Sequence, residues 1–529
     1  MPETKKENRL IWRGAAILTG AAVLVKIMSA VYRMPYQNFA GDVGFYVYQQ
    51  VYPFYALAVA LGGTGFPIVI SKYIAEAGGT RDGRKEEDIR RNALFALSIL
   101  CGLIFTILYL FATPLTHVMG DIHLAPLIRT IAAVYLFVPL IAALRGSFQG
   151  KNENMLPTAV SQIGEQVVRV ALILGTSWYL FLHHGEAYQF GGAATAGSAI
   201  APVASLVILL LFSRKTDTLR MRISRKSADW RLIKELLISG CLFSVLAMPL
   251  IVFQFVDSLT VIPLLGQAHI ADPRAEKGIY DRAYLLTQFG MIAAVSLTAS
   301  IVPGLAKLTA LRRKLEIQRQ ATRALRINLA FGLAAAVGLA AISTDVNTML
   351  FRNADGSLAF AIVALTMLTF SLILTASGIL EAAGRPWQPF IYLAIGAGVK
   401  LGANHLLIPH FSINGAAAAT LLATALTAWL NFRSLRRQSL IGAIRLGQAT
   451  RLCAAVLGMV LAVYLWRLWA GQWAPPSRTL SAVTALSGAL IGGCVFVPLL
   501  FVFRYFSPAD LQQFPFIGRQ SLIRKQKDK

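Results

Sequence analysis

Charged side chains stand inside stretches of this sequence that are otherwise apolar. The basic ones are Lys26, Arg33, Arg169, Arg282 and Lys400, and the acidic ones are Glu165, Asp257 and Glu381. An ionisable side chain in the middle of a bilayer costs about 2.5–3.5 kcal/mol on insertion scales, so such groups normally face a wet cavity or an opposite charge. The excess of cations predicts a cavity for an anionic substrate, because arginine can hold a phosphate or a carboxylate through two parallel hydrogen bonds.

The position of each charge leaves a second interpretation open. The charges near the ends of their apolar stretches, which could snorkel to the headgroups, are Arg33, Asp257, Arg282 and Glu381. Glu165 and Arg169 are four residues apart on one predicted helix, so they could form an ion pair of their own. Lys26 and Lys400 lie deepest, and Lys26 shares a helix face with Arg33, two turns later. For these two lysines we favour a functional role.

The elements that carry these charges are predicted to be membrane-spanning helices. The chain has 529 residues, of which 56% are hydrophobic and 14% charged, with a mean hydropathy of +0.60. A soluble protein keeps roughly a quarter of its residues charged, and a span needs about 20 apolar residues. The predicted spans are 14–36, 43–70, 92–113, 124–146, 157–182, 192–213, 233–257, 279–303, 324–344, 357–382, 387–408, 413–433, 450–470 and 480–504. We therefore expect an all-α polytopic membrane protein with about 14 transmembrane helices.

Basic residues gather in alternate loops between the predicted spans. The net charge is +25, and most Lys and Arg residues fall on one side of the membrane when both termini are placed in the cytoplasm. This distribution favours cytoplasmic loops over nucleic-acid binding, because the basic residues form no single patch or arm. Two basic segments, 305–326 and 435–451, are amphipathic, and we expect them to lie on the inner leaflet against anionic lipids.

Internal similarity divides the chain into repeated parts. The similar pairs of segments are 46–72 with 280–307, and 191–212 with 413–432. The predicted parts are an N-lobe of six spans at 1–215, a C-lobe of six spans at 216–440, and two further spans with a basic tail at 441–529. Parallel repeats of this kind are typical of alternating-access transporters, which bind their substrate at the repeat interface.

No motif for enzyme chemistry or nucleotide-driven transport stands out. The Gly-rich stretch that holds Gly62, Gly63, Gly65 and Pro67 is expected to be a helix break at a gate rather than a phosphate-binding loop. The four cysteines lie singly in apolar segments and indicate neither a metal site nor disulfides. We expect no cofactor, no metal ion and no enzyme activity.

Three stretches carry a resemblance to a known family: YRMPYQNFAGDVGFYVYQQVYPFY, GGTGFPIVISKYIAE and SQIGEQVVRV. They resemble the stage V sporulation protein B branch of the multidrug/oligosaccharidyl-lipid/polysaccharide (MOP) exporter superfamily, which is similar to MurJ-type lipid II flippases. The resemblance implies a two-lobed transporter of the bacterial cell membrane, and we expect one chain to be the functional unit. Its cationic cavity would bind the pyrophosphate-sugar headgroup of an undecaprenyl-linked precursor such as lipid II, and its last two spans would hold the lipid tail. The implied site residues are Lys26, Arg33, Glu165 and Arg169.

The chain departs from this resemblance at two places. Some relatives carry an acidic residue directly after the arginine of the first span, where this chain has Met34. Some relatives bind sodium through carboxylates and amides, for which Asp257 and Asn404 could serve, but Lys400 lies one turn from Asn404. Our hypothesis is that Lys400 pairs with a carboxylate of the C-lobe and acts as a built-in cation, which puts sodium coupling in question.

These observations are compatible with three functions. The leading hypothesis is a flippase that moves a lipid-linked cell-wall or polysaccharide precursor to the outer leaflet. A drug/cation antiporter of the same fold should instead have an acidic cavity and lack the two extra spans. A membrane enzyme acting on polyprenyl-phosphate sugars would need clustered carboxylates at a membrane face, and the nearest cluster, at 84–91, is typical of an ordinary solvated loop.

Overall fold

The protein is helical throughout the part that the structure describes. The computed structural model describes residues 2–78, 83–150, 155–215, 229–442, 446–472 and 477–505, and these hold no β-strand. Ten stretches of that part are long and apolar enough to cross a membrane. The prediction of an all-α polytopic membrane protein is therefore confirmed.

Two of the ten stretches each cover two predicted spans. Ile17–Ala77 covers the first two predicted spans, and Trp387–Arg437 covers the eleventh and twelfth. Each is divided by a residue with non-helical backbone angles, at Gly41 (φ 69°) and at Ser412 (φ 51°). A positive φ at Gly41 strains no side chain, because glycine has no Cβ. These kinks lie where the sequence predicts the loops between spans.

The chain forms two compact units. Unit 1 comprises Met1–Ile292 and Arg385–Thr427, and unit 2 comprises Ala293–Gly384 and Ala428–Lys529. The division into two lobes of six spans and two further spans, which the internal repeat predicts, stays a prediction. All of the predicted site residues except Glu381 belong to unit 1.

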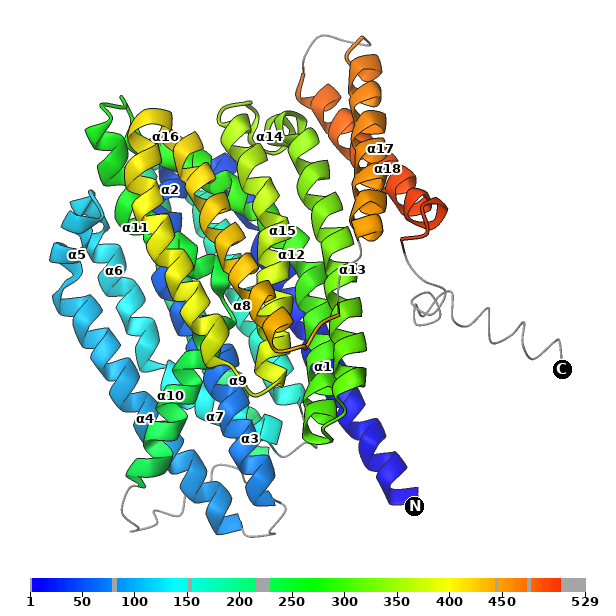
Figure 1. The fold of residues 1–529 in the computed structure, drawn as a ribbon. Coiled ribbons are helices and arrows are strands. Elements are labelled where there is room, and N and C mark those ends of the chain that lie inside the picture. Colours follow the sequence, from blue (N-terminus) through cyan, green and yellow to red (C-terminus); the bar gives the residue numbers. More distant parts are fainter. Residues whose placement is uncertain are drawn as a thin grey trace. The chain divides into compact units, whose positions relative to one another are not determined.

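The helices of unit 1 are shown in Figure 1. They are α1 (Pro2–Val31), α2 (Arg33–Ala60), the π-helical turn η1 (Leu61–Gly65), α3 (Phe66–Gly78), α4 (Gly83–Leu110), α5 (Ala112–Val118), α6 (Ala125–Ala132), α7 (Val138–Gly150), α8 (Leu156–Leu182), α9 (Ala187–Lys215), α10 (Trp230–Leu246), α11 (Pro249–Gln267), and the first parts of α12 (Pro273–Ala310) and α16 (Trp387–Arg437). Helix α8 packs against α1 and α9, and α2 packs against α9 and α11. A hydrophobic core that includes Phe54, Leu97 and Tyr135 lies among α2, α4 and the turn before α7.

Unit 2 contains the remaining helices. They are the second part of α12, α13 (Lys314–Ala341), α14 (Ser343–Phe351), α15 (Ser357–Ala382), the end of α16, α17 (Leu446–Ala470) and α18 (Arg478–Val502). Helix α13 packs against α15 and α17, and α17 lies beside α18 (Figure 1). The outer faces of α17 and α18 expose large aliphatic side chains such as Leu457 and Leu490, as expected for helices in contact with lipid.

The structure corrects the seventh predicted span. The segment 233–257 is divided into α10, which ends at Leu246, and α11, which begins at Pro249. Proline at a first helical position is favourable, whereas inside a continuous helix it would remove a backbone hydrogen bond. Asp257 therefore lies in the middle of α11 instead of closing a span, and it is buried.

One further expectation about a helix end is also corrected. Helix α12 begins at Pro273, so Arg282 lies well inside it rather than opening a span. The segment 305–326 contains the end of α12, at Ala310, and the start of α13, at Lys314, and its place on the inner leaflet stays a prediction. The chain reverses between them at Arg312, which has a positive φ of 56°.

Candidate functional site

Two predicted arginines lie together among tyrosine rings in unit 1. We call Arg33, Arg169, Tyr32, Tyr52 and Tyr55 the arginine–tyrosine cluster. The Arg33 guanidinium carbon lies 4.2 Å from the centre of the Tyr52 ring and 6.0 Å from that of Tyr32. The Arg169 guanidinium carbon lies 5.4 Å from the Tyr32 ring and 5.1 Å from the Tyr55 ring. The Tyr32 ring thus neighbours both cations, within the range of cation–π attraction.

Neither arginine has a carboxylate partner in the described part of the chain. Arg33 is 0% exposed, and none of its three guanidinium nitrogens has a hydrogen-bond acceptor there. Arg169 is 4% exposed, donates one hydrogen bond of 3.3 Å to the Ser29 hydroxyl, and leaves its Nε without an acceptor. Buried charges without partners carry a large desolvation cost. An anion among these groups would offset that cost, and burial excludes the interpretation that Arg33 snorkels to the headgroups.

Glu165 does not pair with Arg169, so the interpretation that these two residues form an ion pair of their own is wrong. Its carboxylate instead accepts a hydrogen bond of 2.8 Å from Arg145, a residue of α7 that is missing from the predicted set. Arg145 also donates to the hydroxyls of Ser161 and Ser205, at 3.1 and 2.7 Å. A basic residue in the last turn of an apolar span is the only sequence signal for it, and that position is equally typical of a snorkelling side chain.

The predicted helix break is a π-helical turn. Leu61–Gly65 forms η1, and the helix continues without interruption into α3, whose second residue is Pro67. The Gly62 carbonyl accepts a hydrogen bond of 3.3 Å from Arg145, and the Gly63 carbonyl accepts one of 3.4 Å from Gln162. Glycine allows the wider turn, and side chains of α7 and α8 satisfy carbonyls there. Gly65 packs directly on α10, which leaves no room for a side chain.

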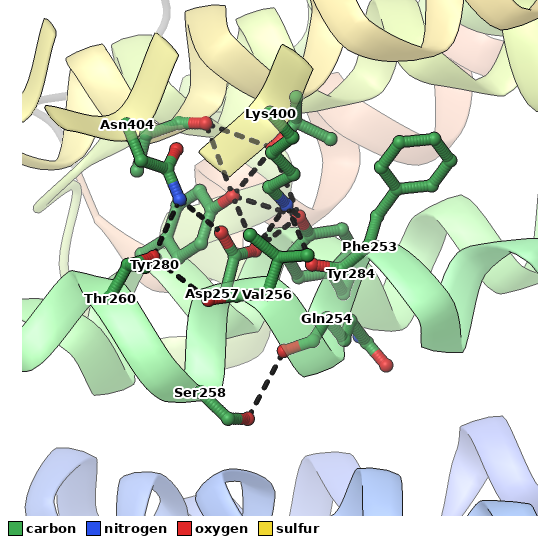
Figure 2. Close-up of polar contacts among 12 residues, drawn as sticks. Phe253, Gln254, Val256, Asp257, Ser258, Thr260, Tyr280, Tyr284, Lys400 and Asn404 are labelled. Atoms are coloured by element: carbon green, nitrogen blue, oxygen red, sulfur yellow. Dashed lines mark hydrogen bonds and ion pairs between the residues drawn. The ribbon is translucent and has the colours of Figure 1, made fainter. Parts of the chain in front are cut away.

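A second buried network surrounds Lys400. Figure 2 shows Lys400 and Asn404 of α16 reaching Asp257 of α11. The Lys400 ammonium lies 2.6 Å from Asp257 Oδ2 and donates to the Phe253 carbonyl at 3.0 Å and to the Tyr284 hydroxyl at 3.3 Å. The side chains of Lys400 and Asp257 are 0% and 1% exposed. The predicted pairing of Lys400 with a carboxylate is therefore confirmed.

The same carboxylate is held by neutral donors. Tyr280 and Tyr284 of α12 donate to Asp257 Oδ2 at 3.1 and 2.9 Å, and Asn404 donates to Oδ1 at 3.2 Å (Figure 2). The Thr420 hydroxyl lies 2.9 Å from that of Tyr280. The cation and its carboxylate thus share one hydrogen-bonded network in the interior, where such networks are rigid when they are satisfied.

The remaining predicted site residues are Lys26, Arg282 and Glu381. Lys26 is exposed on α1, whereas Arg33 is buried, so their shared helix face does not give them one environment. Arg282 is buried and donates from Nε to Asp42 of α2 at 2.8 Å, so it does not snorkel either. Glu381 lies at the end of α15 in unit 2.

Comparison with known proteins places this chain among membrane transporters. A family model described as polysaccharide biosynthesis protein matches residues 11–309. An uncharacterised membrane protein of Bacillus subtilis (strain 168), YabM, is 36% identical over 523 residues, which cover 98% of this chain and 97% of that protein. The chain belongs to the polysaccharide biosynthesis protein family. Stage V sporulation protein B of Bacillus subtilis (strain 168) is 26% identical to this family member, and the match covers 96% of this chain and 98% of that protein. Lipid II flippase MurJ of the same organism is 24% identical, with 92% and 94% covered.

Solved structures share the fold of this family member. Lipid II flippase MurJ in an inward closed conformation has a TM-score of 0.67 at 15% identity and covers 92% of this chain and 98% of that one. An inward-facing multidrug resistance MATE family transporter of the MOP superfamily has a TM-score of 0.63 at 14% identity, with 78% and 94% covered. The predicted membership of the MOP superfamily is confirmed. This family member is a multi-pass membrane transporter, and its relatives are transporters rather than enzymes.

Proposed function

We propose that this protein is an alternating-access flippase of the bacterial cell membrane. It moves an undecaprenyl-pyrophosphate-linked cell-wall precursor, of the lipid II kind, or a polysaccharide precursor from the inner to the outer leaflet. One chain is the functional unit, both termini are cytoplasmic, and basic loops rest on anionic lipids of the inner leaflet. The observation that carries this proposal is the pair of buried arginines, Arg33 and Arg169, that meet no carboxylate in the described part of the chain.

A diphosphate suits this pair better than a neutral or cationic molecule would. Each guanidinium can donate two parallel hydrogen bonds to phosphate oxygens, and charge-assisted bonds of this kind are roughly twice as strong as neutral ones. The tyrosine faces that now neighbour the cations hold them weakly, at about 0.5–2 kcal/mol per contact. A phosphate can therefore replace those contacts with a net gain. Lys26, which is exposed on the same α1–α2 segment, adds a further cation for the substrate.

The names of the relatives support the substrate class. Two of the proteins with matching sequence or fold are named lipid II flippases, and the matching family model is described by polysaccharide biosynthesis. A MATE-like drug/cation antiporter shares the fold and is the alternative. Buried cations without carboxylate partners repel a cationic drug, which is why the flippase is preferred.

Lys400 bears on how transport is driven. In the proposed cycle its ammonium supplies the positive charge beside Asp257 that a bound metal cation would otherwise supply, and the 2.6 Å ion pair supports this role. We therefore propose that transport does not depend on a sodium gradient.

The test uses the purified chain in lipid vesicles with a fluorescent undecaprenyl-pyrophosphate-linked sugar, and measures how fast the probe becomes accessible to an external quencher. The double variant R33Q/R169Q should abolish flipping. The control K72Q/R231Q also removes two positive charges, at side chains that are 68% and 91% exposed, and should flip normally. Equal rates for both double variants would overturn the proposed site.

A cellular experiment separates the alternatives. The protein is depleted in cells that lack related flippases. Accumulation of lipid II inside the cell supports a peptidoglycan role, and accumulation of another polyprenyl-linked glycan assigns that substrate instead. If neither accumulates, the flippase proposal fails and the antiporter is preferred.

A further inference from the structure

Glu165 stands one helical turn before Arg169 on α8, yet its charge is directed elsewhere. Side chains four residues apart on a helix are neighbours, with Cβ atoms about 5–6 Å apart, so a carboxylate at the first and an arginine at the second normally attract each other. Here the Glu165 carboxylate accepts from Arg145 at 2.8 Å, and within the part of the chain that the structure describes it does not pair with Arg169. The arginine of the arginine–tyrosine cluster is therefore left without the counter-ion that its own helix offers.

Arg145 is held so that it can compete for this carboxylate. Its guanidinium donates to Ser161, Ser205 and the Gly62 carbonyl as well as to Glu165, and its side chain is 4% exposed. These acceptors come from α8, α9 and the π-helical turn, so three elements fix the fork in one orientation. A guanidinium satisfied on several sides loses little entropy when it binds a further acceptor.

We infer that Arg145 is a positioning residue that holds Glu165 away from Arg169 and so keeps Arg169 free for the anionic substrate. Without Arg145, Glu165 carries a partly buried charge with no partner, and turning toward Arg169 is the nearest way to neutralise it. Arg169 is then neutralised by its own helix, and an incoming phosphate has to displace a carboxylate. This inference rests on the proposed anion site at Arg169.

The test measures binding of undecaprenyl pyrophosphate to the purified full chain in detergent. R145M should weaken binding roughly tenfold, the scale of one charge-assisted hydrogen bond. The double variant R145M/E165Q should restore binding, because a neutral amide no longer neutralises Arg169. R145M/E165D keeps a carboxylate and should stay weak. K72Q removes an exposed charge outside this network, so it should bind as the unmodified protein does.

The outcomes distinguish this inference from the proposed function. If R169Q binds as tightly as the unmodified protein, the anion site itself is wrong. If R169Q binds weakly while R145M/E165Q is no better than R145M, the site stands and the positioning role of Arg145 is wrong, because a purely structural role predicts no rescue by the second change. Should R145M fail to fold, R145K against R145K/E165Q gives the same comparison. The expected result there is a smaller loss with R145K, which the second change again restores.

Discussion

The Lys400 ammonium lies 2.6 Å from the Asp257 carboxylate, and the two side chains, on α16 and α11, are 0% and 1% exposed. A buried ion pair of this kind is costly to break from one side, because the remaining charge keeps its desolvation cost and loses its partner. The pair therefore fixes these two helices to each other within unit 1.

K400M should lower the free energy of unfolding by about 3–5 kcal/mol, because it leaves Asp257 buried and unpaired. The double variant K400M/D257N should recover a large part of this loss. Thermal unfolding in detergent compares the stability of each variant with that of the unmodified protein. E76Q is the matched control, since its partner Lys72 lies 4.0 Å away on the surface, and it should change stability by no more than about 0.5 kcal/mol. A double variant less stable than K400M would contradict this account.

Transport by the unmodified protein should be the same with a sodium gradient as with a potassium gradient of equal size. The physical reason is that the Lys400 ammonium already occupies the oxygen-lined space beside Asp257, with the Phe253 carbonyl at 3.0 Å. The vesicle assay measures the rate under both gradients. A rate that rises with the sodium gradient and survives K400A would refute the built-in cation.

The double variant K26A/R33A, which removes one charge from α1 and one from α2, should abolish transport while the protein still inserts in the membrane. The buried Arg33 should account for most of this effect, so the transport rate of R33A should be far lower than that of K26A. Insertion is checked by the amount of protein in washed membranes, and transport by the vesicle assay. Normal transport by the double variant would make the pair structural.

G65A should destabilise the protein by about 1–3 kcal/mol, the usual cost of overpacking. A methyl group at Gly65 would stand 2.6 Å from the Gly240 carbonyl oxygen and 2.6 Å from the Ser244 amide nitrogen, both of them backbone atoms of α10. G63A is the matched control in the same π-helical turn, because its nearest neighbour would be the end of Arg145 at 3.6 Å. Equal unfolding temperatures for the two variants would show that α10 is not packed on this turn.

The predicted spans agree with the structure where a helix is defined by its own apolar run. The predicted span 357–382 coincides with α15, and the kinks at Gly41 and Ser412 lie in predicted loops. Hydropathy over such a window is a local property, since each span must satisfy its backbone hydrogen bonds internally in lipid. The seventh span was misplaced because α10 and α11 are both apolar, so only Pro249 marked the boundary between them.

The sequence alone determined that Arg33, Arg169 and Lys400 lie within otherwise apolar stretches, where a charge needs a partner or a ligand. Only the tertiary structure decided which of them have partners. Lys400 finds Asp257 on another helix, Arg145 takes Glu165, and Arg33 and Arg169 are left with tyrosine faces. The physical reason is that an ion pair between helices depends on which helix lies alongside and how it is rotated, and no spacing within a single helix records that.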